Sequence, residues 1–489
     1  MHSPTSLQSI AHRLETVNQG HVLRFYDQLS DDQRRDLLGQ AAAMEIESLP
    51  RLVQEYVVNK PVFALPPEVE PAGYYPLNDR SPGRAWNRDA MRLAGEALIC
   101  AGKVAAFTVA GGQGSRLGYE GPKGCYPAGA VTGKPLFAVF ADALLGAKDR
   151  HGVRVPWYVM TSPLNHAQTV EFFQSGRYFG LDPEDVMFFP QGVMPSLDLK
   201  TGRVLLAKKH EIATNPDGHG GSLRALHVSG ALADMRRRGV EHISYFQVDN
   251  PIVNILDPVF LGLHAAAADS SAQMSSKMVA KAFAEEKVGV FCRAGAGPRK
   301  GRTEIVEYSD LPMEYQRQTG PDGSLRFNAG SIAVHVIGVR FVEQLNTDST
   351  FSLPYHRAEK KIPCVDTATG ETIAPTANNG VKLERFVFDA LPLCERSIVM
   401  ETDRVEEFAP IKNASEAGKI VPDSPDDSRR IQTLRAARWL EACGVAVPKT
   451  ADGAPDCVLE ISPRSASCAA ELKGTGLPKA IERGARVAI

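Results

Sequence analysis

The sequence lacks the long hydrophobic runs that would place it in a membrane or direct it out of the cell. No apolar run in its 489 residues approaches the length of about 18 residues that a membrane-spanning helix needs. The N-terminus also lacks the continuous apolar core of a signal peptide. We therefore expect a cytoplasmic protein that does not bind membranes.

The chain also lacks an excess of charge of either sign. Lys and Arg together number 55 and Asp and Glu 57, which leaves a formal net charge of −2. This balance gives no general attraction to nucleic acid, so any phosphate binding has to be local. Two basic stretches have plain structural roles, since Arg236–Arg238 are expected to end a helix and Arg299–Arg302 to form a hairpin tip. We expect no nucleic-acid partner.

Cysteine patterns typical of metal sites are missing as well. The eight cysteines are scattered, with no C-x-x-C pair and no cysteine and histidine spacing typical of zinc. We expect reduced, mostly buried thiols.

Hydrophobic periodicity and composition predict three consecutive domains. Residues 1–100 have apolar positions at helical spacing and are expected to form a helical N-terminal region. Residues 101–405 alternate strands and helices, which predicts an α/β fold with a mixed, mostly parallel sheet that binds ligands at the carboxyl ends of its strands. Residues 406–489 are expected to form a small C-terminal domain. The central strands are expected at 104–109, 156–161, 186–189, 243–248, 275–279, 289–293, 304–308, 331–336 and 397–401, and the helices at 136–148, 165–175, 222–238 and 257–267.

A glycine-rich loop follows the first of these strands. Residues 104–124 read VAAFTVAGGQGSRLGYEGPKG, in which an apolar, β-branched run ends at paired glycines. Because Gly111, Gly112 and Gly114 have no Cβ, they are free to take positive φ angles and to let backbone N–H groups approach a ligand closely. The loop is therefore suited to hold an anion with several phosphates.

Two cations on the same loop, Arg116 and Lys123, strengthen this interpretation. The Walker pattern needs a Gly-Lys-Ser/Thr ending, which is missing. The dinucleotide fingerprint needs G-x-G-x-x-G, whereas Gly112, Gly114 and Gly118 are spaced one residue too far. Neither of these two phosphate loops fits the sequence.

Other polar residues follow predicted strands or lie in loops. Asp249 follows a strand, where a carboxylate is able to hold Mg²⁺ beside phosphates, although it also fits a plain turn before Pro251. His219, in the loop NPDGHGGS, fits either a substrate contact or a solvated histidine. Gln191 offers the donor and the acceptor that reading a uracil edge requires, a weak signal on its own. Plain roles as strand-end or surface residues apply equally to Glu307, Tyr308, Asn328, Lys382 and Lys412.

Nine motifs follow one another along the chain: FTVAGGQGSRLGYEGPKG, NPDGHGG, FQVDN, GVFCR, EIVEYSD, FNAGSIA, EKKIPCVD, NGVKLERFVFD and EFAPIKNA. In this order they resemble the eukaryotic-type UDP-N-acetylhexosamine pyrophosphorylases, members of the UDP-sugar pyrophosphorylase superfamily. The resemblance implies a Rossmann-like nucleotidyltransferase domain between a smaller N-terminal region and a small β-rich C-terminal domain. It also implies that UTP reacts with a sugar 1-phosphate, foremost N-acetylglucosamine 1-phosphate, to give a UDP-sugar and pyrophosphate.

The resemblance further implies a role for each candidate residue. The catalytic cations would be Arg116, Lys123 and Lys412. The nucleotide would be bound by Ala110, Gly111, Gly112, Gly114, Gln191, Gly218 and Lys382. The sugar would be lined by His219, Glu307, Tyr308 and Asn328. Asp249 would hold Mg²⁺, with Mn²⁺ as an alternative.

Two residues depart from the family pattern and keep alternatives open. Ser115 stands where threonine is usual, and His219 stands where the N-acetylhexosamine enzymes usually have asparagine. The glucose-1-phosphate branch often has histidine there, so a UTP–glucose-1-phosphate uridylyltransferase is the alternative. A covalent uridylyl-histidine enzyme would need a His-x-His motif, which is absent. A non-catalytic UDP-sugar-binding protein is the remaining alternative, and we expect a monomer or weak homo-oligomer.

Overall fold

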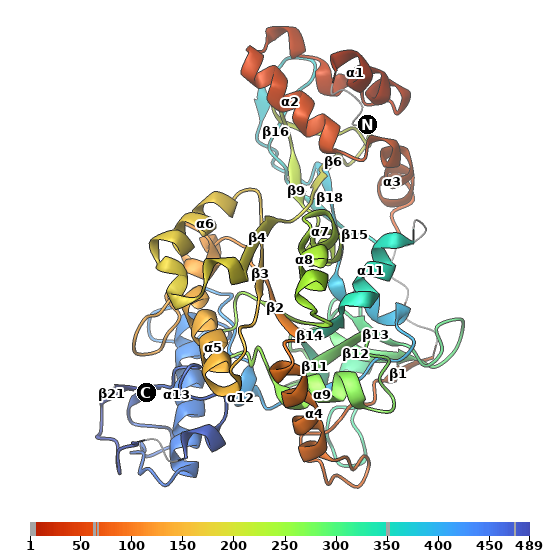
Figure 1. The fold of residues 1–489 in the computed structure, drawn as a ribbon. Helices are drawn as coiled ribbons and strands as arrows, with labels where there is room; N and C mark the ends of the chain where they lie inside the picture. Colours follow the sequence, from red (N-terminus) through yellow and green to blue (C-terminus); the bar gives the residue numbers. More distant parts are fainter. Residues whose placement is uncertain (1–5, 62–64, 66–67, 349–352, 474–475) are drawn as a thin grey trace. The chain divides into compact units, whose positions relative to one another are not determined.

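The computed structural model describes residues 6–61, 65, 68–348, 353–473 and 476–489 (Figure 1). The chain divides into two compact units, and each has its own hydrophobic core. Unit 1 consists of Met1–Ala64, Gln191–Ser222 and Leu353–Val387, and unit 2 consists of Leu65–Pro190, Leu223–Ser352 and Phe388–Ile489. These units differ from the three consecutive domains that the sequence predicted, because each unit is assembled from three separate segments.

A ten-stranded mixed sheet forms the centre of unit 2 within the described residues. Strands β10, β2, β3 and β4 are parallel neighbours in this order, and β14 continues the sheet antiparallel to β10 (Figure 1). The predicted mixed α/β class is confirmed. The strand bounds are β1 Val69–Pro71, β2 Val104–Val109, β3 Trp157–Thr161, β4 Val186–Pro190, β10 His242–Gln247, β11 Met274–Ala280, β12 Val290–Ala294, β13 Thr303–Val306, β14 Ala329–Gly338 and β19 Val399–Glu401.

Strand β2 lies at the centre of the parallel group, and all six of its residues are buried. A parallel strand covered on both faces requires a continuous apolar run, which is what VAAFTV supplies. Aromatic side chains, among them Phe137, Trp157 and Phe246, form the core beside it. The sheet therefore fixes the loop after Val109 in space.

The helices of unit 2 mostly agree with the predicted periodicity. One prediction was wrong, because the helix expected at 222–238 is broken at Gly230, whose φ of +83° interrupts the helical path. Arg236–Arg238 end the second piece, as predicted. The helix bounds are α4 Arg88–Cys100, α5 Leu136–His151, α6 His166–Ser175, α7 Ser222–Val228, α8 Ala231–Arg238, α9 Pro258–Ala266, α10 Met313–Gln316, α11 Val339–Thr347, α12 Arg404–Glu407 and α13 Pro425–Ala442.

Unit 1 packs N-terminal helices against short strands from later in the chain. Leu14, Leu37 and Leu52 share a core with Leu206 and Val381. The N-terminal region is thus covered by strands, which its own sequence does not reveal. The elements are α1 Leu7–Thr16, α2 Asp31–Ala43, α3 Leu49–Leu52, β5 Val193–Pro195, β6 Leu197–Asp198, β7 Leu206–Lys208, β8 Glu211–Ile212, β9 Thr214–Pro216, β15 His356–Lys360, β16 Cys364–Val365, β17 Thr372–Ile373 and β18 Gly380–Glu384.

The C-terminal part of unit 2 has a small core of its own around Trp439, Leu459 and Leu472. Its described residues hold α13 and two paired strands, β20 Val458–Glu460 and β21 Arg486–Ala488. This part therefore contains more helix and loop than strand, whereas the sequence predicted a β-rich domain. Among the described residues, none of the helices is long and apolar enough to cross a membrane.

Candidate functional site

The glycine-rich loop leaves the carboxyl end of β2 and is held from two sides. The side-chain amide of Asn165, which is fully buried, donates to the carbonyl oxygens of Ala110 at 3.0 Å and Gly112 at 3.3 Å. The backbone N–H of Lys123 donates to the same Gly112 carbonyl at 3.0 Å. Since these carbonyls are occupied by the protein, the loop has a defined path.

The glycines of this loop are not used as the sequence predicted. Gly111, Gly112 and Gly114 do not take positive φ angles, and Gly114 has a φ of −79°. The left-handed positions belong to Gly118 at +69° and Gly121 at +134°, which shape the return of the loop. The first three glycines therefore do not use the positive φ angles that are open to them.

Gly112 and Gly114 differ in the space around their Cα atoms. A Cβ on Gly114 would lie 2.7 Å from the Tyr119 ring, so packing within the protein requires glycine there. A Cβ on Gly112 would meet only the Lys123 Cδ, at 3.9 Å. The space above Gly112 is therefore open. Neither the backbone angles nor the protein neighbours of Gly112 require glycine at this position.

Lys123 and Asp249 meet at the carboxyl ends of the neighbouring strands β2 and β10. The Lys123 Nζ lies 3.3 Å from the Asp249 Oδ2, and the two side chains are 15% and 16% exposed. Burial raises the pKa of Asp249, but the positive charges of Lys123 and Lys412 outweigh burial and hold this pKa below its usual value. Asp249 is therefore ionised between two lysines, and Lys123, Asp249 and Lys412 form the charged cluster of the site.

The segment that carries Lys412 runs beside the end of β10. The N–H of Ile411 donates to the Asp249 carbonyl at 2.9 Å, and the N–H of Lys412 donates to the Asp423 carbonyl at 2.7 Å. The Lys412 side chain is exposed, with its Nζ 5.4 Å from the centre of the Phe408 ring. Its charge is thus available to a ligand.

Arg116 lies on a short 3₁₀ turn, Ser115–Leu117, and its side chain is exposed. Among the described residues it has no ion pair. Like Lys412, it is therefore a cation that a ligand is able to reach.

Three predicted sugar contacts lie at the strands of the sheet that follow β10 on the side of β14. Glu307 follows β13, and its carboxylate lies close to the backbone of Gly289. Tyr308 is 39% exposed. Asn328 precedes β14, and its carbonyl accepts from the N–H of Lys281 at 2.9 Å. In the order of the sheet, these residues belong to strands on the side of β10 away from β2 and the glycine loop.

Unit 1 carries the remaining predicted residues. Gln191 is 7% exposed, and Lys382 lies on β18 opposite Ala358. Gly218 has a φ of +84°, and a Cβ on it would lie 2.3 Å from the Arg385 carbonyl oxygen. Glycine is therefore obligatory at 218 for the fold itself.

Ring stacking and a hydrogen bond to the backbone orient His219. Its ring stacks on Phe386, with 5.1 Å between centres and 8° between planes. Its Nδ1 accepts from the N–H of Val387 at 3.1 Å. Burial, and secondly the nearby His356, lower the pKa of His219 to about 4. The ring is therefore neutral at pH 7, and its proton is on Nε2.

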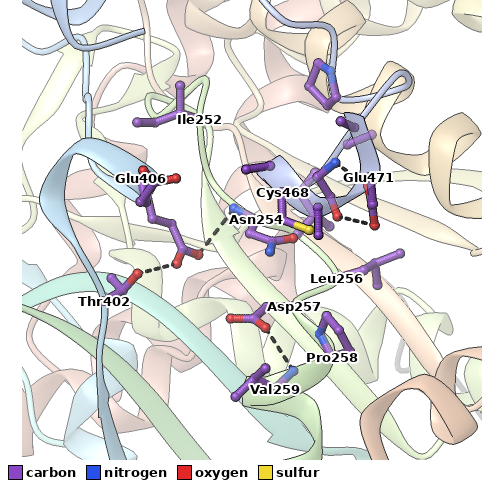
Figure 2. A pocket seen from close by; sticks show the side chains of 18 of the residues that line it. Ile252, Asn254, Leu256, Asp257, Pro258, Val259, Thr402, Glu406, Cys468 and Glu471 are labelled. Atoms are coloured by element: carbon purple, nitrogen blue, oxygen red, sulfur yellow. Dashed lines mark hydrogen bonds between the residues drawn. The ribbon is translucent and has the colours of Figure 1, made fainter. Parts of the chain in front are cut away.

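A separate cavity of about 940 Å³ lies in unit 2 between the stretch 251–259 and the segments 402–407 and 466–471 (Figure 2). Figure 2 shows Asn254, Asp257 and Thr402 at its wall, together with Cys468 from the C-terminal part. None of the predicted site residues lines it.

Sequence reasoning missed two asparagines that order the site. Asn165 fixes the glycine loop, and Asn250, beside Asp249, is 5% exposed and bonds to the segment that leads to Lys412. The FQVDN motif contained the signal for Asn250, but a pattern does not show what an amide will contact.

The charged cluster fits a divalent cation only if a ligand completes the coordination. The described residues contain no group of three or more His, Cys, Asp or Glu that could hold a metal. Asp249 offers an ionised carboxylate in the charged cluster. One carboxylate is what Mg²⁺ uses when phosphates and water supply the other oxygens.

Comparisons with known proteins agree with the fold and with the motifs. The family model described as UTP–glucose-1-phosphate uridylyltransferase matches residues 83–423. Human UDP-N-acetylhexosamine pyrophosphorylase-like protein 1 is 36% identical over 488 residues, which cover 94% of this chain and 92% of that protein. UDP-N-acetylglucosamine pyrophosphorylase of Saccharomyces cerevisiae is 34% identical over 449 residues, covering 88% and 90%. The crystal structure of the Trypanosoma brucei uridine diphosphate N-acetylglucosamine pyrophosphorylase in complex with inhibitor superposes with a TM-score of 0.79 at 25% identity and covers 98% of both chains.

Proposed function

This chain belongs to the UTP–glucose-1-phosphate uridylyltransferase family, and we propose that its glycine loop and charged cluster transfer the uridylyl group of UTP to N-acetylglucosamine 1-phosphate. The enzyme is a uridylyltransferase whose products are UDP-N-acetylglucosamine and pyrophosphate. The observation that carries the proposal is the cluster of Lys123, Asp249 and Lys412 beside the open space at Gly112.

The chemistry needs positioning and charge neutralisation more than a base. Both reactants are polyanions, and a sugar phosphate is already ionised at neutral pH, so its oxygen is able to attack the α-phosphorus of UTP directly. Lys123 and Lys412 would neutralise the phosphates, and the exposed Arg116 would stabilise the leaving pyrophosphate. The backbone at Gly111 and Gly112 would approach the phosphates without a side chain in the way.

Asp249 is the residue that would hold Mg²⁺, or Mn²⁺ in its place. When bound, the metal would supply further positive charge to the phosphates. The lowered pKa of Asp249 supports this role, because the carboxylate is ready to bind a cation at neutral pH.

In unit 2, Glu307, Tyr308 and Asn328 are proposed as sugar contacts. In unit 1, His219 is proposed as a sugar contact, Gln191 and Gly218 as uracil contacts, and Lys382 as a phosphate contact. Similarity to UDP-N-acetylglucosamine pyrophosphorylases supports N-acetylglucosamine as the sugar. The neutral His219 is compatible with it, because Nε2–H is a hydrogen-bond donor, as is the side-chain amide of an asparagine. The same donor also suits a glucose hydroxyl, so glucose 1-phosphate is the second candidate. We further propose a cytoplasmic enzyme that acts as a monomer or weak homo-oligomer without nucleic acid.

The test is pyrophosphate release from UTP, Mg²⁺ and one sugar 1-phosphate at a time. N-acetylglucosamine 1-phosphate is expected to give the highest kcat/KM, above N-acetylgalactosamine and glucose 1-phosphates. A preference for glucose 1-phosphate would favour the second candidate, and no release with any sugar would favour a non-catalytic binding protein. Asp249→Asn serves as the inactive control.

A further inference from the structure

We propose that Asn250 and Glu407 are positioning residues that hold the backbone leading to Lys412 beside Asp249 for the reaction. The proposal rests on the proposed function, because it assigns a task to side chains that would not touch substrate. Asn250 directly follows Asp249, and Glu407 ends α12, five residues before Lys412.

Asn250 links the end of β10 to residues 407–409 through both the nitrogen and the oxygen of its side-chain amide. Its Nδ2 donates to the Glu407 carbonyl at 2.7 Å, and its Oδ1 accepts from the N–H of Ala409 at 3.1 Å. The backbone bond from Ile411 to the Asp249 carbonyl continues the same pairing. The chain from 407 to 411 is therefore fastened to residues 249 and 250 at three points.

The Glu407 side chain is held by a second set of polar contacts. The Nζ of Lys277, a fully buried residue on β11, lies 2.6 Å from both Glu407 oxygens and 2.7 Å from Asp257. The Glu407 carboxylate also accepts from the Thr402 hydroxyl at 2.9 Å and from the Asn254 N–H at 3.2 Å. A carboxylate held by these three groups fixes the end of α12 in one position.

A buried ionic cluster of this kind is poorly explained by stability alone. Removing charged groups from water costs much of what their attraction returns, so apolar residues of similar volume often stabilise a core as well or better. Lys277, Asp257 and Glu407 are 0%, 12% and 5% exposed in their side chains. Their directional bonds do specify where the backbone of 402–407 lies.

The cavity beside this segment provides an independent reason. Thr402, Glu406 and Glu407 line the space of about 940 Å³, and Figure 2 shows Thr402, Glu406 and Asn254 at its wall. Thr402 and Asn254 both donate to the Glu407 carboxylate. Packing is missing on the cavity side of residues 402–407, so polar bonds orient them there, whereas Phe408, Ala409 and Ile411 further along the segment are buried in hydrophobic clusters. Loss of the ties should let Lys412 move away from Asp249.

The experiment compares Asn250→Ala and Glu407→Gln with a matched control. In each variant we would measure kcat, the KM for UTP and for the sugar phosphate, the Tm, and the hydrogen exchange of the backbone amides at 409 and 411. We expect loss of protection at these amides and a fall in kcat of about 10- to 100-fold with smaller changes in KM, because the catalytic groups are misplaced while substrate is still bound. Glu407→Gln keeps the size of the side chain and leaves Lys277 paired with Asp257, so this variant is expected to fold.

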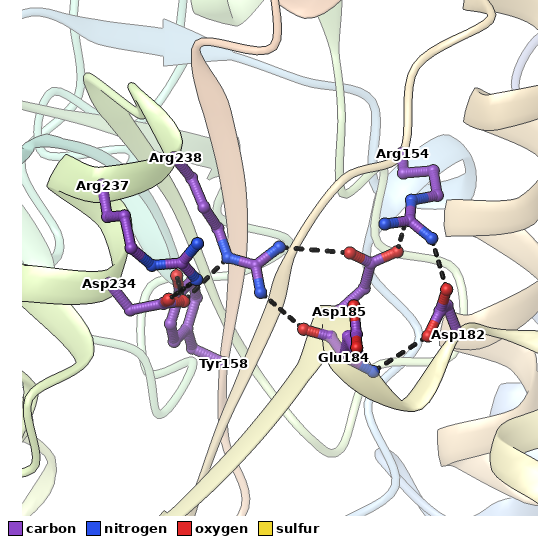
Figure 3. A network of polar contacts seen from close by, with 8 residues as sticks. All are labelled: Arg154, Tyr158, Asp182, Glu184, Asp185, Asp234, Arg237 and Arg238. Carbon is purple, nitrogen blue, oxygen red and sulfur yellow. Dashed lines mark hydrogen bonds and ion pairs between the residues drawn. The ribbon is translucent and has the colours of Figure 1, made fainter.

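Asp185→Asn is the control, because Asp185 is equally buried and ion-paired but lies at the amino end of β4. Figure 3 shows its carboxylate between Arg154 and Arg238. The two ion pairs measure 3.1 and 3.2 Å, and the Asp185 side chain is 8% exposed. Each arginine keeps another acid when Asp185 is changed, Asp182 for the first and Asp234 for the second. This variant should lower the Tm without lowering kcat.

Four results would overturn the inference in distinguishable ways. Normal amide protection in both variants would show that the segment is held by something else. Lost protection with kcat within twofold of the wild type, or an equal fall of kcat in Asp185→Asn, would show a structural role only. A wild-type protein that releases no pyrophosphate would refute the proposed function itself, whatever the amides show.

Discussion

Lys123 and Asp249 are 126 residues apart in the chain, yet their charged groups lie 3.3 Å from each other at the carboxyl ends of two adjacent parallel strands. The same strands, β2 and β10, carry a second pair at their amino ends, where Lys103 lies 2.8 Å from Glu241. One sheet thus offers two lysine–carboxylate pairs of similar chemistry, of which only the first faces the glycine loop.

The two pairs provide a matched test of catalysis. Lys123→Ala should lower kcat by about 10²–10³-fold, because a positioned cation is lost where charge develops in the transition state. Lys103→Ala removes a surface pair and should leave kcat unchanged. Circular dichroism would verify that both variants are folded. Similar turnover in the two variants would contradict the role given to Lys123.

The glycines of the loop allow binding and folding to be separated. Gly112→Ala should keep the Tm of the wild type, since its Cβ would meet nothing closer than 3.9 Å, yet it should raise the KM for UTP about tenfold or more by entering the phosphate space. Gly114→Ala should instead cost about 1–3 kcal/mol of stability, because its Cβ would press on Tyr119. Thermal unfolding and UTP titration measure the two effects. An unchanged KM in Gly112→Ala would place the triphosphate elsewhere.

Glu460 is expected to secure the C-terminal part of unit 2. Its carboxylate accepts from the N–H groups of Val131 and Thr132 at 2.7 and 2.8 Å and from the Thr132 hydroxyl at 2.6 Å. Glu460→Gln turns one acceptor into a donor that faces other donors, so the free energy of unfolding should fall by about 1–3 kcal/mol. The exposed Glu482→Gln is the control in the same denaturant titration. Equal stability of the two variants would mean that the Glu460 contacts do not stabilise the fold.

The elements of the parallel sheet could be predicted from sequence because their signals are local. The predicted strand 104–109 coincides with β2, since a short, continuous apolar run that ends at glycines is typical of a buried parallel strand. The helix at 222–238 was predicted without its break, because apolar periodicity continues on both sides of Gly230 and conceals the left-handed turn.

Relations between distant residues could not be read in this way. The periodicity of the N-terminal helices shows an apolar face but not that Leu206 and Val381 cover it. The motifs drew attention to Asp249, whereas the burial of Lys277 and its bonds to Glu407 leave no mark in the sequence, since a lone lysine in a strand is usually a surface residue. The sequence thus allowed candidate site residues to be named, but not the contacts that orient them.

Acid is expected to destabilise the fold through a pair of buried histidines. His264 on α9 is fully buried and shares a hydrogen bond of 2.9 Å with the Ser275 hydroxyl. His242 lies edge-on to it, with 5.1 Å between ring centres. Burial, and secondly the charge of His242, lower the pKa of His264 well below its usual value.

The direction of the pH effect follows from this shift. In the unfolded chain His264 takes up a proton near its ordinary pKa of about 6.5, whereas in the folded protein it resists protonation. Stability is therefore complete above this pH and falls as the pH drops below it, by about 1.4 kcal/mol per pH unit for each such group. Carboxylates such as Asp249, whose pKa is lowered, lose their contribution only at lower pH. Burial raises the pKa of Glu304 and Asp423, and such carboxyls change the stability in the opposite sense, so the contribution of His264 is taken from the difference between a variant and the wild type.

Denaturant titrations at several pH values from about 7.5 to 5 measure the slope directly. His264→Asn should reduce the slope, because one buried imidazole no longer has to be kept neutral, while an asparagine is still able to bond to Ser275. His12→Asn, at an exposed position, should keep the slope of the wild type. If His264→Asn and the wild type lose stability equally as the pH falls, the buried histidine pair is not the source of the acid sensitivity.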